Sequence, residues 1–239
     1  MQKIRVSAVS YTNTKPFVYG LQHSGILDQI DLSLDIPSDC AAKLINNEAD
    51  IGLVPVAALL NIPDYKIVSD YCIGAVEAVN SVFIFSDKPI DQIKTIRFDK
   101  QSRTSNALAR VLIKHHWKLN PEFSDAETAD AFVEIGDRTF GKKQSYAYSY
   151  DLAEEWIKFT GLPFVFAVWA ANKTIEKSFI EEFNAALTVG LENRAVVIEN
   201  LPQFPGFDLE DYLMRRIDFP LTSDKLKALD LFLSLVREL

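Results

Sequence analysis

The sequence predicts a two-lobed α/β protein whose second lobe is inserted into the first. Strand-like and helix-like segments alternate from Ile4 to Tyr71, which is typical of a mainly parallel sheet with helical crossovers. Two almost entirely apolar runs, Cys72–Phe85 and Phe164–Ala170, could each carry the chain between lobes. A second block of strands and helices separates these runs. We therefore expect a clamshell-like fold with two hinge crossings and a ligand site between the lobes.

The first lobe is expected to contain residues 1–79 and 171–239. In its N-terminal part, alternation and helical spacing of apolar residues predict the elements in order. These are a strand at Ile4–Val9, a helix at Phe17–Leu21, a strand at Asp31–Ile36, a helix at Cys40–Asn47, a buried strand at 49–55 and a strand at Tyr65–Tyr71. After residue 170 the pattern is helical, with amphipathic segments at Leu209–Arg216 and Ser223–Leu239.

The second lobe is expected to span residues 80–170. Ile93–Phe98 and Ala131–Ile135 have the composition of strands, and the helix after Ser102 has an apolar face. A further helix begins near Tyr150. The apolar crossings near Ser81 and Ala167 would then form the hinge.

Composition argues against several classes of protein. The 239-residue chain carries a net charge of −8, and an acidic protein repels phosphate backbones, so no nucleic-acid partner is expected. No apolar run is long enough to span a bilayer, and no leader-like pattern precedes the first strand. We expect a soluble, cytoplasmic protein. Cys40 and Cys72 have no metal-site spacing and neither require nor exclude a disulfide. The oligomeric state remains unknown from these patterns.

Ser102-Arg103-Thr104-Ser105 is the best local signal for an anion site. It lies where a strand gives way to a helix, so free backbone N–H groups and the positive end of the helix dipole face the loop. The hydroxyls and the arginine add donors suited to a carboxylate. The alternative is an ordinary Ser or Thr helix cap. A phosphate-binding P-loop is disfavoured because its glycines are missing.

Other polar groups stand at strand ends, where open α/β sheets bind ligands. Ser10 to Pro16 follows the first strand, Asn80-Ser81 interrupts the first apolar crossing, and Gly136-Asp137 ends a later strand. Turn formation, hinge backbone contacts and capping are the respective alternatives. His115 and His116 are adjacent on a helix and cannot easily chelate one metal. No metal or cofactor is expected, and the ligand is a small anionic or polyhydroxylated molecule.

Taken together, the motifs resemble the chorismate dehydratase family of the futalosine route to menaquinone. The resemblance extends over nearly the whole chain, in order. Its matching stretches are Val9–Asn13 with Pro16, Ala49–Pro55, Asn80–Val82, Ser102–Ser105, Ile135–Asp137, Asp151–Trp156, Thr160–Trp169 and Tyr212–Ile217.

The resemblance implies a type II periplasmic-binding-protein-like fold and a carbon–oxygen lyase. It implies loss of water from chorismate to give 3-[(1-carboxyvinyl)oxy]benzoate, with no cofactor and no membrane partner. Asn13 is the catalytic candidate, as an orienting group rather than a base. The base would be a carboxylate of the substrate itself. The implied substrate-binding residues are Ser10, Tyr11, Pro55, Asn80, Ser81, Ser102, Arg103, Thr104, Ser105, Gly136 and Asp137.

The sequence departs from the family pattern in three places. Thr12 replaces a usual Leu, Glu77 a common Gly, and Thr139-Phe140 a usual Ala-Leu. Two alternatives also stay open. One is a lyase of the same pathway that releases 1,4-dihydroxy-6-naphthoate. The other is a binding protein for a small carboxylate that performs no chemistry, against which the lack of a leader argues.

Overall fold

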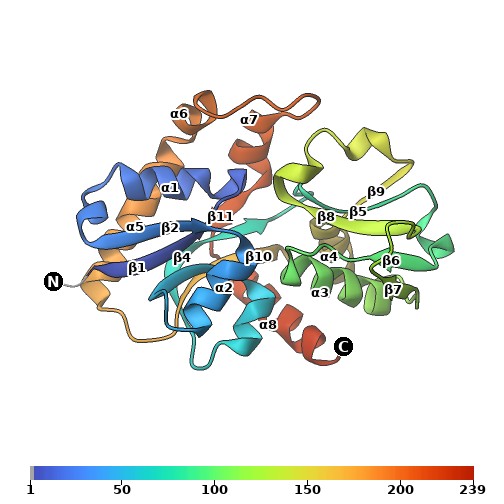
Figure 1. Cartoon of the computed structure of the whole chain (residues 1–239), viewed down its shortest axis with the longest axis horizontal. Coiled ribbons are helices and arrows are strands. Elements are labelled where there is room, and N and C mark those ends of the chain that lie inside the picture. Colours follow the sequence, from blue (N-terminus) through green and yellow to red (C-terminus); the bar gives the residue numbers. More distant parts are fainter. Residues whose placement is uncertain (1–2) are drawn as a thin grey trace.

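A computed structural model describes residues 3–239 and confirms the two-lobed α/β architecture (Figure 1). Each lobe is built on one sheet, and helices cover the sheets. Residues 1 and 2, which the sequence analysis placed in the first lobe, lie outside the described residues.

The sheet of the first lobe has the strand order β11-β4-β10-β3-β1-β2. Both pairs formed by β1 are parallel, whereas β10 is antiparallel to each of its neighbours, β3 and β4. The strands β1 to β4 therefore all run in one direction, as their alternation with helices predicts. The bounds are β1 Ile4–Val9, β2 Ile30–Asp35, β3 Ile51–Pro55, β4 Lys66–Ala75, β10 Phe164–Ala171 and β11 Asp218–Pro220.

Strand β10 lies in the middle of this first sheet. The expected boundary at residue 170 had placed residues 164–170 in the second lobe, whereas the structure places them in the sheet of the first. The apolar run of β10 indicates burial on both faces but does not indicate which sheet accepts it. The rest of the division into lobes remains a proposal.

The second sheet has the order β7-β6-β8-β5-β9 and mixes parallel and antiparallel pairs. Its central strand, β8, pairs in parallel with β6 and antiparallel with β5. The bounds are β5 Val82–Ser86, β6 Thr95–Arg97, β7 Glu122–Ser124, β8 Ala131–Ile135 and β9 Tyr148–Asp151.

Helices α1 and α5 lie side by side over one face of the first sheet, and α2 lies on the other face (Figure 1). Helix α8 contacts both β10 and α3, so the C-terminal helix touches both lobes. The helices are α1 Lys15–Gln22, α2 Pro37–Ile45, α3 Arg103–Val111, α4 Leu152–Thr160, α5 Lys177–Glu192, α6 Arg194–Glu199, α7 Leu209–Asp211 and α8 Ser223–Arg237.

Helices α1 and α5 approach closely because each has a glycine at the crossing. A Cβ atom added to Gly190 would overlap the backbone oxygen of Pro16, and one added to Gly20 would overlap the oxygen of Ala186. The contact therefore brings backbone against backbone, and it fixes α1 directly after the loop that carries Asn13.

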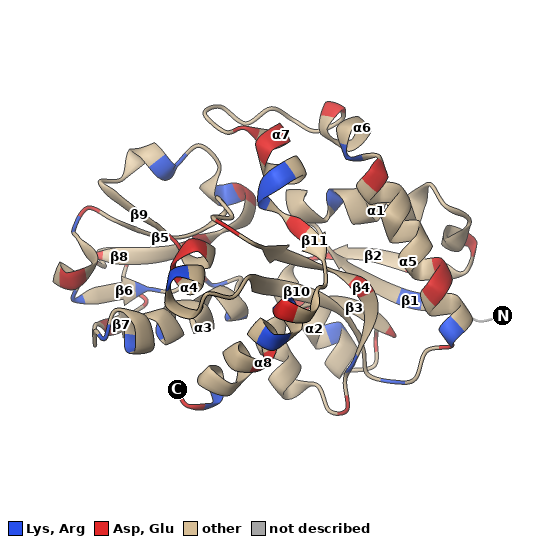
Figure 2. Cartoon of the chain, turned by 180° about the vertical axis from the view of Figure 1, so that it is seen from behind, with Lys and Arg blue, Asp and Glu red and all other residues tan. Residues whose placement is uncertain are grey.

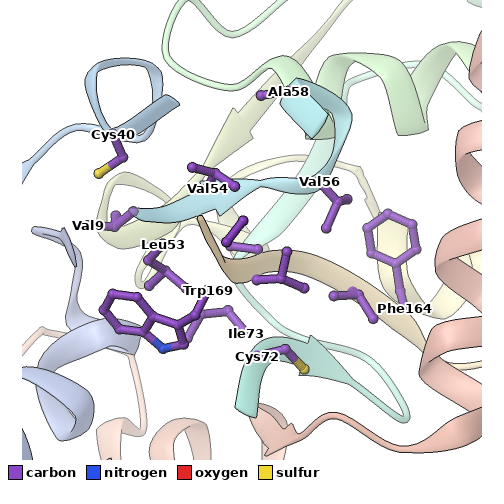
Figure 3. Close-up of a cluster of buried hydrophobic side chains, with 14 of the residues drawn as sticks. Val9, Cys40, Leu53, Val54, Val56, Ala58, Cys72, Ile73, Phe164 and Trp169 are labelled. Carbon is purple, nitrogen blue, oxygen red and sulfur yellow. The ribbon is translucent and has the colours of Figure 1, made fainter. Parts of the chain in front are cut away.

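The buried core of the first lobe is shown in Figure 3. Leu53, Val54 and Trp169 have no exposed surface, and side chains from β1, β3, β4 and β10 pack together in this cluster. Cys40 and Cys72 are buried, free thiols in different parts of this cluster (Figure 3).

Candidate functional site

A cavity of about 570 Å³ lies between the two lobes, where the carboxyl ends of β1, β3 and β8 face each other. This volume includes space that is open to solvent, and a cleft between two lobes is a common place for a small-molecule site. It is lined by Val9, Tyr11, Asn13, Thr14, Pro37, Leu53, Pro55, Ile73, Val79, Ser81, Val82, Ser102, Thr104, Ser105, Ile135, Gly136, Phe166, Ala167 and Ile217.

The cavity lining is uncharged. Its described residues are apolar side chains together with hydroxyls and one amide, and none is Lys, Arg, Asp, Glu or His. Lys, Arg, Asp and Glu residues are distributed along both lobes (Figure 2). A ligand must therefore be recognised by hydrogen bonds and helix-terminus N–H groups rather than by ion pairs.

The first turn of α3 places three hydroxyl groups on the cavity wall. Ser102 caps the helix, because its Oγ accepts a hydrogen bond of 3.1 Å from the backbone N–H of Ser105. The same Oγ donates to Ser105 Oγ at 2.9 Å. Thr104 Oγ1 accepts from the backbone N–H of Ala57 at 3.1 Å, which joins this helix to the first lobe.

Ser81 brings a fourth hydroxyl from the crossing between β4 and β5. Its side chain is buried, and Oγ accepts a hydrogen bond of 2.9 Å from the phenol of Tyr212. Burial raises the pKa of Tyr212, so the phenol keeps its proton and acts as the donor.

Three of these hydroxyl groups act as hydrogen-bond acceptors toward the protein. Ser81, Thr104 and Ser105 each accept a hydrogen bond from the protein. For their own protons, the contacts within residues 3–239 include no protein acceptor. Each proton is therefore available to a ligand, and the wall presents donors. Such a wall favours an acceptor such as a carboxylate.

Asn13 lines the cavity from a short 3₁₀ turn between β1 and α1. Its Oδ1 accepts a hydrogen bond of 3.1 Å from Thr14 Oγ1, so the amide NH₂ remains as its donor group. The side chain also lies near the phenol of Tyr212 and offsets part of the rise that burial causes in the pKa of that group. An amide held in this way can orient a ligand or stabilise developing charge.

Tyr11 and Gly136 meet across the interface between the lobes. Gly136 has a left-handed φ of +65°, and an added Cβ would lie 3.1 Å from the ring of Tyr11. A side chain at position 136 would therefore press on the tyrosine. The phenol of Tyr11 donates to Gln101 Oε1 at 2.7 Å, and burial raises the pKa of this tyrosine. Pro55 completes the predicted set that lines the cavity.

Four predicted site residues lie outside the cavity lining. Ser10 is exposed at the end of β1. Arg103 is exposed because the first helical position of α3 faces away from the cavity, whereas the next two face it. The two others, Asn80 and Asp137, make contacts between elements instead.

Asn80 has a left-handed φ of +57°, which turns its side chain to a neighbouring polar cavity. Its backbone N–H donates to Asp151 Oδ2 at 2.7 Å, and its Oδ1 accepts from Lys143 at 3.3 Å. Burial raises the pKa of Asp151 to about 6. Asparagine tolerates this backbone conformation better than most residues.

The departures from the expected motif have specific partners. Thr12 donates to Asp137 across the lobes, and Glu77 forms an ion pair of 3.2 Å with Arg216 beside the crossing. Thr139 Oγ1 donates to the oxygen of Gly136 at 2.8 Å. With Glu77 at this position, the backbone that follows it still places Ser81 in the cavity lining.

Sequence reasoning did not select Tyr212 or Thr14 as site residues. Tyr212 is separated from Ser81 by 131 positions. Its place in an amphipathic helical pattern indicates only that its side chain packs in the core. Within residues 3–239, no three His, Cys, Asp or Glu side chains cluster as a metal site. Over the same range, no helix combines the length and apolarity needed to cross a membrane.

Comparison with solved structures shows the same fold in several proteins. A protein from Archaeoglobus fulgidus is similar at a TM-score of 0.76 and 16% identity, over 99% of this chain and 97% of that one. A Candida albicans gene product described as having the generic periplasmic binding protein fold matches at 0.68 and 14%, over 100% and 91%. An alkanesulfonate-binding protein from Xanthomonas axonopodis, bound to MOPS, matches at 0.62 and 18%, over 98% and 93%.

These likenesses confirm the predicted periplasmic-binding-protein-like fold. At such low identity they carry no information on this chain's ligand. Comparison with protein families is more specific, because a model described as menaquinone biosynthesis matches residues 4–238.

Proposed function

Since the chain belongs to this menaquinone biosynthesis family, we propose that it is a chorismate dehydratase, which eliminates water from chorismate to give 3-[(1-carboxyvinyl)oxy]benzoate. The observation that carries the proposal is the uncharged cavity wall whose hydroxyls at positions 81, 104 and 105 all present protons. Chorismate carries two carboxylates, which are the acceptors that such a wall requires.

The two ends of the cavity provide separate anchoring points. Ser102 to Ser105 lie at the start of α3, where free backbone N–H groups and the helix dipole favour one carboxylate. Ser81 lies on the crossing between the lobes and would hold the other carboxylate. The apolar floor, which includes Leu53 and Ile73, suits the carbon ring between them.

Among residues 3–239, those that line the cavity supply no carboxylate, imidazole or amine that could act as a base. We therefore assign the proton transfer to a carboxylate of the bound substrate. It takes the proton from the ring carbon, the hydroxyl group leaves from the ring, and the two combine as water while the ring becomes aromatic. Asn13 orients the reacting groups through its amide NH₂.

The direct test is to incubate the purified protein with chorismate and to identify products by chromatography and mass spectrometry. We expect an aromatic product lighter than chorismate by one water, formed faster than in a protein-free control. Asn13→Ala should lower kcat far more than it weakens binding of chorismate. Equal losses of kcat and affinity would make Asn13 a simple binding contact.

Two other results would contradict the proposal. Thermal stabilisation by chorismate without any product would support a binding protein that performs no chemistry. Release of 1,4-dihydroxy-6-naphthoate from a cyclic futalosine derivative, without turnover of chorismate, would support the other lyase of the pathway.

A further inference from the structure

A fully buried phenol separates the cavity from a second, more polar one. Tyr212 is only 1% exposed and does not line the cavity between the lobes, although it lines the neighbouring cavity with Phe207 and Arg216. Its hydroxyl donates to Ser81 at 2.9 Å, and the side chain of Asn13 lies close enough to offset part of the rise in its pKa. The phenol therefore bonds one of the two polar residues on which the proposed reaction depends and lies beside the other.

The ring of Tyr212 is held firmly in place. Phe140 and Phe207 pack edge-on against it, each with a centroid distance of 5.2 Å. Tyr212 also opens a π-helical turn that ends at Arg216, and its own N–H donates to the oxygen of Asp208 at 3.1 Å. Single π-helical turns occur frequently at functional sites.

The hydrogen bonds around this phenol have a fixed direction. Thr14 donates to the oxygen of the Asn13 amide, so the NH₂ group of Asn13 is the part that can donate to Tyr212. Tyr212 then donates to Ser81 Oγ. As a result the proton of Ser81 is left for a ligand, and Asn13 keeps one orientation of its amide.

We infer that Tyr212 is a positioning residue of the active site, which sets the amide of Asn13 and the hydroxyl of Ser81 without touching the substrate. The inference rests on the proposed function for its kinetic consequence. Without the phenolic hydroxyl, Ser81 loses its hydrogen-bond donor, so its own proton can turn away from the ligand. The amide of Asn13 can then also rotate.

The test replaces only the hydroxyl. Tyr212→Phe keeps the ring and its packing, and Tyr71→Phe is the matched control, because Tyr71 bonds Thr188 at 2.8 Å and does not line the cavity. We expect kcat of Tyr212→Phe to fall roughly tenfold to a hundredfold, since small errors of orientation have effects of this size. KM should change less than kcat, and Tyr71→Phe should match the unmodified enzyme.

A second measurement separates positioning from a general loss of structure. If Tyr212 acts through Asn13 and Ser81, the effect of Tyr212→Phe on kcat should shrink in an Asn13→Ala background and in a Ser81→Ala background. Undiminished effects in both backgrounds would overturn the inference, as would a Tyr212→Phe enzyme with kcat and KM equal to those of Tyr71→Phe.

A third measurement does not depend on activity. The side-chain NH₂ signals of Asn13, assigned by their loss in Asn13→Ala, should shift in NMR spectra of Tyr212→Phe and remain in place in Tyr71→Phe. If chorismate is not turned over but these signals shift, the proposed function fails and the positioning role stands. Unshifted signals would overturn the role whatever the reaction.

Discussion

The carboxylate of Asp137 in the second lobe accepts hydrogen bonds from both the backbone N–H and the hydroxyl of Thr12 in the first. The N–H lies 3.1 Å from Oδ1, and the hydroxyl lies 2.9 Å from Oδ2. These residues stand at the ends of β1 and β8, directly beside the cavity. This contact therefore helps to hold the two lobes together in the closed arrangement.

Thr12→Val should make the lobes separate more readily. The change keeps the shape and the backbone bond but removes the hydroxyl donor to a charged acceptor, an interaction that contributes about 1.5–3 kcal/mol. The ratio of closed to open molecules should therefore fall roughly tenfold or more. Small-angle X-ray scattering of the ligand-free protein should show a larger radius of gyration.

The control for this change is Thr139→Val, whose hydroxyl bonds the oxygen of Gly136 within the second lobe. It should lower stability without altering the scattering profile. Identical scattering from the two variants would show that the contact between Thr12 and Asp137 does not govern closure.

Neighbouring residues at the start of α3 should differ sharply in their importance for binding. Ser105→Ala removes a cavity donor and should weaken chorismate binding roughly tenfold to a hundredfold, the value of a hydrogen bond to a charged group. Arg103→Ala should change the affinity by less than about threefold, because its exposed side chain does not line the cavity. Isothermal titration calorimetry measures both effects, with each change made in an Asn13→Ala background so that the expected slow turnover does not obscure binding. A larger loss from Arg103→Ala would reverse this assignment.

Gly190→Ala should disturb both stability and turnover. Its new methyl group would overlap the oxygen of Pro16, so α1 must move away from α5. Overpacking of this kind costs about 1–3 kcal/mol or more, and the shift should displace the loop that carries Asn13. Urea denaturation and kcat should both report the change. Gly25→Ala is the control, because nothing lies within 4 Å of its added Cβ atom; equal behaviour of the two variants would contradict the prediction.

Asp50 should govern part of the acid sensitivity of the protein. Hydrogen bonds from Arg5, and then from Lys173, hold the pKa of Asp50 well below its ordinary value. An unfolded Asp has a pKa of about 3.9. The stabilisation is therefore present above about pH 4 and is lost as the pH falls through the lower native pKa.

Asp50→Asn should lower the free energy of unfolding at pH 7, and the difference from the unmodified protein should narrow as the pH falls below about 4. Urea denaturation across this pH range measures it. Asp31→Asn, at an exposed position of β2, is the control. A constant difference at every pH would mean that Asp50 acts through something other than its charge.

Much of the fold could be predicted because local patterns determine it. Apolar, strand-like runs predicted β1 and β8 with their observed bounds, and helical spacing predicted the apolar face of α3. The position of β10 could not be predicted, because an apolar strand fits either sheet. Strands as short as β7 and β11, three residues each, have too few residues for a periodic signal.

The candidate site was predictable only as a set of strand and helix ends. Residue types predicted an anion site at Ser102 to Ser105, but they did not predict that Arg103 would face outward. Orientation depends on the helix axis, which tertiary packing determines. Tyr212 was missed as a site residue for a related reason, because its role depends on contacts with residues far away in the sequence.

The central place of β10 has a consequence for the order of folding. It joins β3 to β4, yet it is synthesised only after all five strands of the second sheet. During synthesis, β3 and β4 are therefore complete before the strand that lies between them. The second sheet is contiguous in sequence and can already form at that stage. We expect the inserted part to fold first, and the first sheet to close around the returning strand at the cost of a long loop.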